Sequence, residues 1–364
     1  MTMTINSAPI PESFLSLSPT ELNKRIIEVK AKLGKRLLIL GHHYMSDEVI
    51  AHADERGDSF ALAKIAAQTD AEFIVFCGVH FMAETADIVT ASNQKVFIPD
   101  SGAGCFLADC ARIRDVEDAW RETKSMTSDI IVPITYVNSG ADMKAFCGNN
   151  GGLVCTSSNA DKALKWAFKR GEKVFFFPDQ HLGRNTAFAM GIPLNEIILW
   201  DPDEPLGGNS LEAIKQAKVI LWNGFCIVHQ EFNVAYIEKL RQDDPKINII
   251  VHPECDFDVA QTADFMGSTA DIIRRIADAP SGSHWAVATE KNLVNRLKNI
   301  YPDKRIEILQ SFEPYCKSMA QITLTKLAYQ LDQIDHGNLI NQVIVEEQYT
   351  ASARIALNRM LELK

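Results

Sequence analysis

A repeated order of segments constrains this fold most. A short unbroken run of Val, Ile, Leu and Phe is followed by a polar cluster and then by a segment with helical periodicity. Strands that are covered on both faces read as continuous apolar runs, whereas half-exposed strands alternate. Such runs separated by helices are typical of an α/β fold with parallel sheets. We expect strands at 36–40, 73–76, 95–98, 130–135, 152–155, 173–177, 196–199, 218–222, 247–251, 284–288 and 305–309.

The polar clusters occur at one consistent place, directly after a predicted strand. His42 follows the first run, Tyr136 follows the run at 130–135, and His252 and Glu254 follow the run at 247–251. In open α/β sheets, ligands bind outside the carboxyl ends of the strands. The sequence therefore predicts a ligand site at this edge.

The pattern also recurs within the chain. Seventeen positions separate His42 from Ser59, and 17 separate His252 from Thr269; a middle segment keeps the same order at longer spacing. Such self-similarity favours three related α/β units, with chance recurrence of a few polar residues as the alternative. The predicted units are 1–114 completed by 317–364, then 115–227, then 228–316.

Charge and hydropathy argue against nucleic acids and membranes as binding partners. The net charge is −10 and basic residues form no stripe, so we expect no nucleic-acid binding. No apolar run approaches the roughly 18 residues of a membrane helix, and the first residues resemble no targeting peptide. We expect a cytoplasmic protein that binds no membrane.

Three of the eight cysteines occupy related positions. Cys105, Cys226 and Cys316 end equivalent segments of the three predicted units. Three thiolates around one point suit a metal or an iron–sulfur cluster with one iron left open. Alternatively, each cysteine packs as a small apolar side chain, and Cys110 could substitute as a ligand.

Hydroxyl residues begin several helical periods. Ser59, Ser157 and Thr269 lie in loops that suit helix N-capping. The same geometry exposes backbone N–H groups that bind carboxylate or phosphate, and both interpretations stay open.

Titratable side chains at strand ends are the candidates for proton transfer. They are His42, Tyr44, Tyr136, His252 and Glu254, with hydrogen-bonded loop residues as the alternative interpretation. Burial behind an apolar strand is expected to raise the pKa of Glu254 toward the range of a general base.

Twelve short motifs in a fixed order resemble the quinolinate synthase family, from about Gly41 to Met360. They are GHHYM (41–45), GDS (57–59), CGVHFMAETA (77–86), AGCFLAD (103–109), YVNS (136–139), CTSSNA (155–160), PDQHLG (178–183), GFCIVH (224–229), HPEC (252–255), GST (267–269), ATE (288–290) and CKSMAQITL (316–324). Each motif alone is short, but the ordered series is specific.

The resemblance implies three similar α/β units around a 4Fe-4S cluster with Cys105, Cys226 and Cys316 as ligands. It implies catalytic roles for Glu254, Tyr44, Tyr136, His42 and His252, with Glu254 as the base. The implied substrate-binding residues are His42, Ser59, Tyr136, Asn138, Ser157, His252, Glu254 and Thr269, and His229 is implied to lie on the cluster side of the cavity.

The implied reaction condenses iminoaspartate with dihydroxyacetone phosphate to quinolinate, the precursor of NAD, and releases phosphate and two waters. The open iron would act as a Lewis acid, and L-aspartate oxidase would supply the imine. Two departures from the family pattern are the single Cys316 in place of a C-x-x-C-x-x-C segment, and extra residues around 147–152.

Two other functions stay open on the residues alone. A hydrolytic metalloenzyme would bind zinc or manganese through His42, His43 and His252. An iron–sulfur sensor would hold the cluster without turnover. Sulfide content separates the first from the leading interpretation, and quinolinate formation separates the second.

Overall fold

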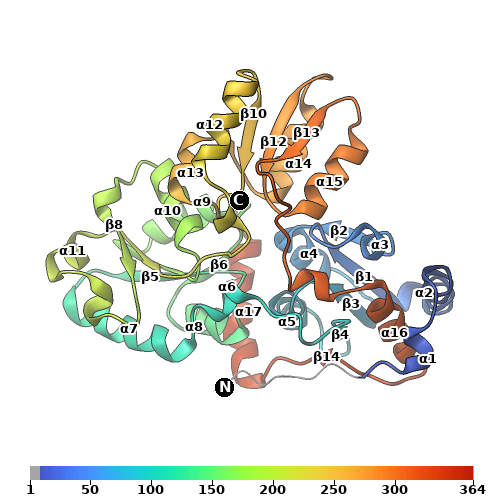
Figure 1. Cartoon of the computed structure of the whole chain (residues 1–364). Coiled ribbons are helices and arrows are strands. Elements are labelled where there is room, and N and C mark those ends of the chain that lie inside the picture. Colours follow the sequence, from blue (N-terminus) through green and yellow to red (C-terminus); the bar gives the residue numbers. More distant parts are fainter. Residues whose placement is uncertain (1–8, 364) are drawn as a thin grey trace. The chain divides into compact units, whose positions relative to one another are not determined.

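The computed structural model describes residues 9–363, which form two compact units. Unit 1 comprises the described residues up to Cys105 together with Tyr315–Glu346. Unit 2 comprises Phe106–Pro314 and the described residues from Glu347 onward. Each unit is therefore built from two separate stretches of chain (Figure 1).

Unit 1 contains one five-stranded sheet in the order β14-β4-β3-β1-β2. Its neighbours pair in parallel, except that β14 is antiparallel to β4. The strands are β1 (Leu37–His42), β2 (Glu55–Gly57), β3 (Phe73–Cys77), β4 (Lys95–Phe97) and β14 (Gln342–Val343). The helices are α1 (Glu12–Leu15), α2 (Pro19–Leu33), η1 (Gly34–Arg36), α3 (Asp47–Ile50), α4 (Ser59–Ala66), α5 (His80–Val89), η5 (Met319–Gln321) and α16 (Leu324–Asp335).

Unit 2 contains two parallel sheets, ordered β6-β5-β7-β9-β8 and β11-β10-β12-β13. The strands are β5 (Ile131–Tyr136), β6 (Leu153–Cys155), β7 (Lys173–Phe177), β8 (Ile197–Trp200), β9 (Val219–Trp222), β10 (Asn248–Val251), β11 (Phe265–Met266), β12 (His284–Ala288) and β13 (Arg305–Ile308). The helices are α6 (Phe106–Asp109), α7 (Ile113–Met126), α8 (Ala141–Asn149), α9 (Ala160–Phe168), α10 (Gln180–Ala189), η2 (Leu194–Glu196), η3 (Pro205–Gly208), α11 (Leu211–Gln216), η4 (His229–Glu231), α12 (Val234–Asp243), α13 (Phe257–Thr262), α14 (Thr269–Asp278), α15 (Lys291–Ile300) and α17 (Glu347–Leu361).

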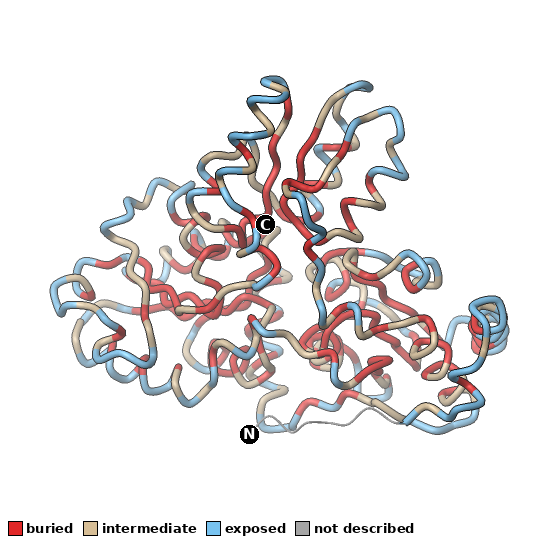
Figure 2. Tube along the Cα trace, in the orientation of Figure 1, coloured by how far each residue is buried: buried red, intermediate tan, exposed pale blue. Residues whose placement is uncertain are grey.

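The hydrophobic core follows the strands. Every residue of β3, β5 and β7 is buried, which is why these runs lack polar alternation. Figure 2 shows this burial as red along the strands, with exposed blue segments along the helices. The prediction of an α/β fold with parallel sheets is confirmed, and a strand forms at each of the predicted positions.

The internal repeat is visible in the strand order. β2-β1-β3-β4 in unit 1 has the same chain order as β11-β10-β12-β13 in unit 2. The two segments also share a loop contact: the N–H of Ile39 donates to Asp54 Oδ2, and the N–H of Ile249 donates to Asp264 Oδ2, both at 2.8 Å. Identical local bonding at corresponding positions supports related α/β units.

The C-terminal stretch divides between the two units. Residues 317–364 were assigned to the first predicted unit, but α17 instead packs on α8 in unit 2. Ser352 Oγ donates to Asn149 Oδ1 at 2.5 Å, and Arg359 Nη1 donates to the carbonyl of Gly152 at 2.6 Å. The remaining unit boundaries stay a prediction. Within residues 9–363, no helix combines the length and the apolarity that crossing a bilayer requires.

Candidate active site

A buried carboxylate follows β10 in unit 2. The chain turns directly after Val251, with the N–H of Cys255 donating to the carbonyl of His252 at 3.0 Å. The N–H of Glu254 donates to His252 Nδ1 at 3.4 Å. The turn buries both side chains, each only 3% exposed.

A tyrosine from the other sheet of unit 2 meets this carboxylate. Tyr136 is the last residue of β5, and its hydroxyl donates to Glu254 Oε1 at 2.5 Å. Since Tyr136 is also buried, this bond lies away from solvent. A short bond from a phenol to a carboxylate is charge-assisted and holds one carboxylate oxygen in place.

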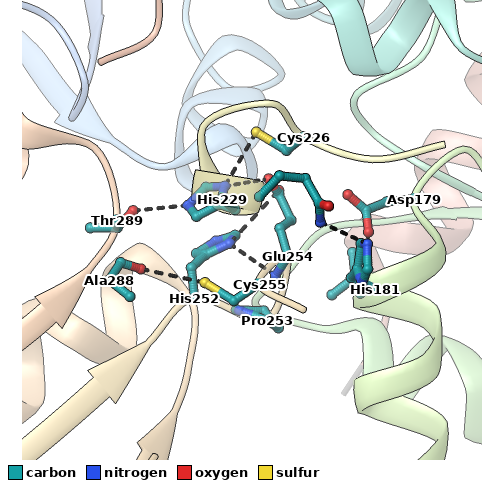
Figure 3. A network of polar contacts seen from close by, with 12 residues as sticks. Asp179, His181, Cys226, His229, His252, Pro253, Glu254, Cys255, Ala288 and Thr289 are labelled. Carbon is teal, nitrogen blue, oxygen red and sulfur yellow. Dashed lines mark hydrogen bonds and ion pairs between the residues drawn. The ribbon is translucent and has the colours of Figure 1, made fainter. Parts of the chain in front are cut away.

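His229 contacts the second carboxylate oxygen. Its Nδ1 lies 2.9 Å from Glu254 Oε2 and 3.2 Å from Cys226 Sγ. Its Nε2 lies 3.2 Å from Thr289 Oγ1, and its ring stacks on His252 at a centroid distance of 4.5 Å. Figure 3 shows Cys226, His229, His252 and Glu254 gathered in this network.

The ionisation of Glu254 differs from the sequence prediction. Burial favours its protonated form, but the charges of His252 and His229 and the hydrogen bonds from His229 and Tyr136 outweigh burial and lower the pKa. Burial lowers the pKa of His252 to about 3, so that imidazole is neutral at neutral pH. The prediction of a raised Glu254 pKa was wrong, because it considered burial without these donors.

A second layer holds the turn that carries Glu254. Asn185 in α10 is fully buried, and its Nδ2 donates to the carbonyls of Pro253 and Cys255 at 2.9 and 2.8 Å. These two carbonyls flank Glu254 in the sequence. Both ends of the turn are thus fixed to α10.

Asp179, next to this layer, is also buried. Its Oδ1 accepts from the N–H of Leu182 and caps α10. Burial raises the pKa of Asp179 well above its usual value, and the nearby charge of Glu254 raises it further. Burial and the Glu254 charge therefore both favour the protonated form of Asp179 over its anion.

The predicted residues of unit 1 occupy corresponding positions at the end of β1. His42 is buried, and its Nδ1 accepts from the N–H of Tyr44 at 3.2 Å. The two rings meet edge to face at 4.7 Å. Ser59 is the first residue of α4, while Asp58 caps that helix by accepting from the N–H of Ala61.

The remaining predicted residues of unit 2 lie beside helix starts and strand ends. Thr269 is the first residue of α14, and Ser268 caps that helix. Ser157 lies between β6 and α9, where Asn159 Oδ1 accepts from the N–H of Thr156 at 2.7 Å. Among the described residues, no donor reaches the buried Oδ1 of Asn138, so it can accept from a ligand.

The structure thus joins the predicted residues Tyr136, Cys226, His252 and Glu254 through His229. No role was expected for Asn185, because no sequence pattern reveals that a polar residue within a helix is buried. Thr289 was included only within the ATE motif at 288–290. The spacing from His42 to His80 is 38 positions, as is that from His252 to Glu290, and this further repeat could have drawn attention to the neighbouring Thr289.

The cysteines fall into two groups. Cys77, Cys147, Cys155 and Cys255 are fully buried, and burial raises the pKa of each thiol. Cys105, Cys110, Cys226 and Cys316 are partly exposed. The predicted ligands belong to the accessible group, which suits thiolates that bind metal. Within residues 9–363, one group of three donor atoms lies within 4.8 Å: those of Cys226, His229 and Glu254.

Comparison with known families decides the relationship. The profile of the family described as quinolinate synthetase A protein matches residues 24–362. The chain belongs to this family. It is 51% identical over 358 residues to a quinolinate synthase of Geobacillus sp. (strain WCH70), a match that covers 97% of this chain and 96% of that protein.

Two further relatives give the same result. A quinolinate synthase of Bacillus cereus (strain G9842) is 50% identical over 97% of this chain and 96% of its own length. One of Herpetosiphon aurantiacus is 50% identical over 97% of this chain and 95% of its own length. Membership in the quinolinate synthetase A family makes the chain an enzyme and confirms the resemblance seen in its motifs.

Proposed function

We propose that the chain condenses iminoaspartate with dihydroxyacetone phosphate to form quinolinate, phosphate and two waters. The family membership supports this reaction, because the relatives are quinolinate synthases. The reaction forms one C–C and one C–N bond and needs no net oxidation or reduction. It requires a base and acids that move protons between carbon, nitrogen and oxygen.

The observation that carries the proposal is the buried array of Tyr136, Glu254 and His229. Glu254 would accept a proton from a substrate carbon, and its two hydrogen-bonded oxygens fix the direction of its carboxylate. Tyr136 would return a proton to a leaving hydroxyl. His252 is neutral, so it can accept a hydrogen bond or donate one without adding charge.

Substrate anions would bind at the helix starts. Ser59, Ser157 and Thr269 each lie at or just before a helix N-terminus, where backbone N–H groups and the helix dipole favour carboxylate and phosphate. His42 would assist as a further donor, Tyr44 would donate near the substrate carbonyl, and Asn138 would orient the substrate through its amide.

Three half-buried cysteines would hold the 4Fe-4S cluster: Cys105, Cys226 and Cys316. Cys105 and Cys316 belong to unit 1, and Cys226 belongs to unit 2. When bound, the cluster supplies a Lewis-acidic iron without a cysteine ligand. We further propose a cytoplasmic enzyme that takes its unstable imine from an L-aspartate oxidase.

The test is anaerobic purification followed by iron and sulfide counting and an assay of quinolinate from both substrates. We expect bound sulfide, and product that depends on both substrates. Bound zinc or manganese without sulfide would favour the hydrolytic enzyme. A cluster without turnover would favour the sensor.

The role of Glu254 has its own test. Glu254→Gln should keep the cluster and lose about 10²–10⁴-fold in rate, the usual contribution of a general base. Full turnover in this variant would contradict the assigned role.

A further inference from the structure

The side chains of Cys226, His229 and Glu254 offer sulfur, nitrogen and oxygen atoms that all lie within 4.8 Å of one another. We infer that, in the chain without its cluster, these three side chains form a binding site for a divalent transition metal of the zinc class. Such a site differs from a cysteine-only cluster site because it uses one thiolate, one imidazole and one carboxylate.

Two of the three donor pairs lie slightly closer together than the ligands of a tetrahedral metal site. Zinc bonds of about 2.3 Å to sulfur and about 2.0–2.2 Å to nitrogen and oxygen place tetrahedral ligand pairs about 3.3–3.6 Å apart. Here His229 Nδ1 lies 3.2 Å from Cys226 Sγ and 2.9 Å from Glu254 Oε2. These two pairs would reach the tetrahedral spacing if His229 Nδ1 moved a few tenths of an ångström away from each partner.

The second layer around the donors is already in place. Tyr136 donates to Glu254 Oε1, which leaves Oε2 to face the metal. Thr289 Oγ1 lies 3.2 Å from His229 Nε2. A hydroxyl can donate or accept, so it satisfies Nε2 when the proton leaves Nδ1. Metal-binding histidines usually have such a partner on the other ring nitrogen.

The ligand set selects the class of metal. A thiolate with an imidazole suits Zn²⁺ and Co²⁺, whereas Mg²⁺ and Ca²⁺ prefer oxygen ligands alone. Three protein ligands leave a fourth position for water. His229 and Glu254 are almost fully buried, so the ion would neutralise an anion that lies away from solvent.

The consequence rests on the proposed function, because it assigns Cys226 to the cluster. Both sites would compete for the single thiolate of Cys226. Zinc bound by Cys226, His229 and Glu254 would therefore block cluster assembly, and the cluster would exclude zinc.

Titration of the cluster-free full chain with Co²⁺ tests the inference. We expect one equivalent to bind with a thiolate-to-metal charge-transfer band and tetrahedral visible bands, and Zn²⁺ to bleach both. Cys226→Ser should abolish the charge-transfer band. Glu254→Gln should weaken binding by more than the roughly 10–100-fold that the loss of a second-layer partner costs, and Thr289→Val should weaken it within that range.

Control variants separate this site from the other cysteines. Cys110→Ser changes another half-exposed thiol of unit 2 and should leave the spectrum unchanged. Cys105→Ser and Cys316→Ser should also retain binding, with circular dichroism confirming the fold of each variant.

Loss of Co²⁺ binding in Cys105→Ser or Cys316→Ser would overturn the inference, because it would assign the metal to the three cysteines. Unchanged binding in Cys226→Ser would overturn it as well. The titration measures no turnover, so a chain that forms quinolinate but binds no Co²⁺ when cluster-free would refute this inference alone.

Discussion

Tyr136 and Glu254 are joined by a 2.5 Å hydrogen bond, although Tyr136 ends a strand of one sheet of unit 2 and Glu254 lies in the turn after a strand of the other. Neither side chain could be held in this way by its own strand. The position of the anionic oxygen therefore depends on how the two sheets pack within that unit.

Removing this bond should change both the rate and its pH dependence. In Tyr136→Phe we expect quinolinate formation to fall by about 10²–10⁴-fold if the phenol acts as an acid. The pKa of Glu254 should rise, since a donor to its ionised form is lost. Activity requires the anion, so the acidic limb of kcat/KM should move to higher pH.

Tyr236→Phe is the matched control, since it removes a tyrosine hydroxyl whose hydrogen bond, to the Ser311 hydroxyl at 2.8 Å, is exposed to solvent. Equal pH profiles for the Tyr136 variant and the native chain would argue against the link between Tyr136 and Glu254.

Asn185 should act as a positioning residue. Asn185→Ala removes the donor to Pro253 and Cys255 and should lower kcat by about 10²-fold, with a smaller change in KM, as the turn that carries Glu254 shifts. Circular dichroism and urea unfolding measure the accompanying loss of stability.

Asn209→Ala provides the comparison, because Asn209 Nδ2 also donates to backbone carbonyls, those of Leu199 and Gly207 at 2.7 and 2.8 Å. We expect it to lose stability and keep kcat. A parallel loss of kcat in both variants would show that Asn185 acts only through general stability.

His181 should make unfolding depend on pH. Burial lowers the pKa of His181 to about 4 in the native chain. Between about pH 6.5 and pH 4, His181 is therefore protonated in the unfolded chain but not in the native chain. Stability should therefore fall as pH falls through this window, by up to about 1.4 kcal/mol per pH unit from this side chain.

Urea unfolding at several pH values checks this prediction. His181→Gln should flatten the slope, whereas His336→Gln, at an exposed position after α16, should leave it unchanged. An unchanged slope in the His181 variant would refute the assignment.

Gly148 marks the closest approach of α8 to α17. A Cβ there would lie 1.9 Å from the backbone carbonyl oxygen of Ser352, so Gly148→Ala must push the helices apart. Overpacking of this kind costs about 1–3 kcal/mol, which thermal or urea unfolding would detect. Gly104→Ala, where a Cβ meets nothing within 4 Å, should keep native stability.

The long apolar strands were predictable because a strand that is buried on both faces consists of a continuous run of apolar residues. The three strands that the sequence did not predict are β2, β11 and β14, which have two or three residues each. β2 reads Glu-Arg-Gly with two exposed residues, so its pairing with β1 is decided by the loop around Asp54 and not by hydrophobicity.

The sequence pointed to several side chains that the structure brings into contact, but not to their electrostatics. Strand ends and motifs identified Tyr136, His252 and Glu254, because chain order places such residues at one sheet edge. The pKa of Glu254 depends on donors from Tyr136 and His229, which lie far from it in sequence. Asn185 escaped notice for the same reason: its partners Pro253 and Cys255 lie about seventy positions away.

The interleaving of the two units bears on how the chain acquires its structure during synthesis. Unit 1 needs Tyr315–Glu346 and unit 2 needs α17, so neither can be completed until nearly the whole polypeptide has left the ribosome. Until these C-terminal segments are synthesised, the sheet edges that they cover stay exposed. Contacts between residues so distant in sequence also form slowly. A nascent chain that stalls before residue 315 would therefore be a natural substrate for chaperones.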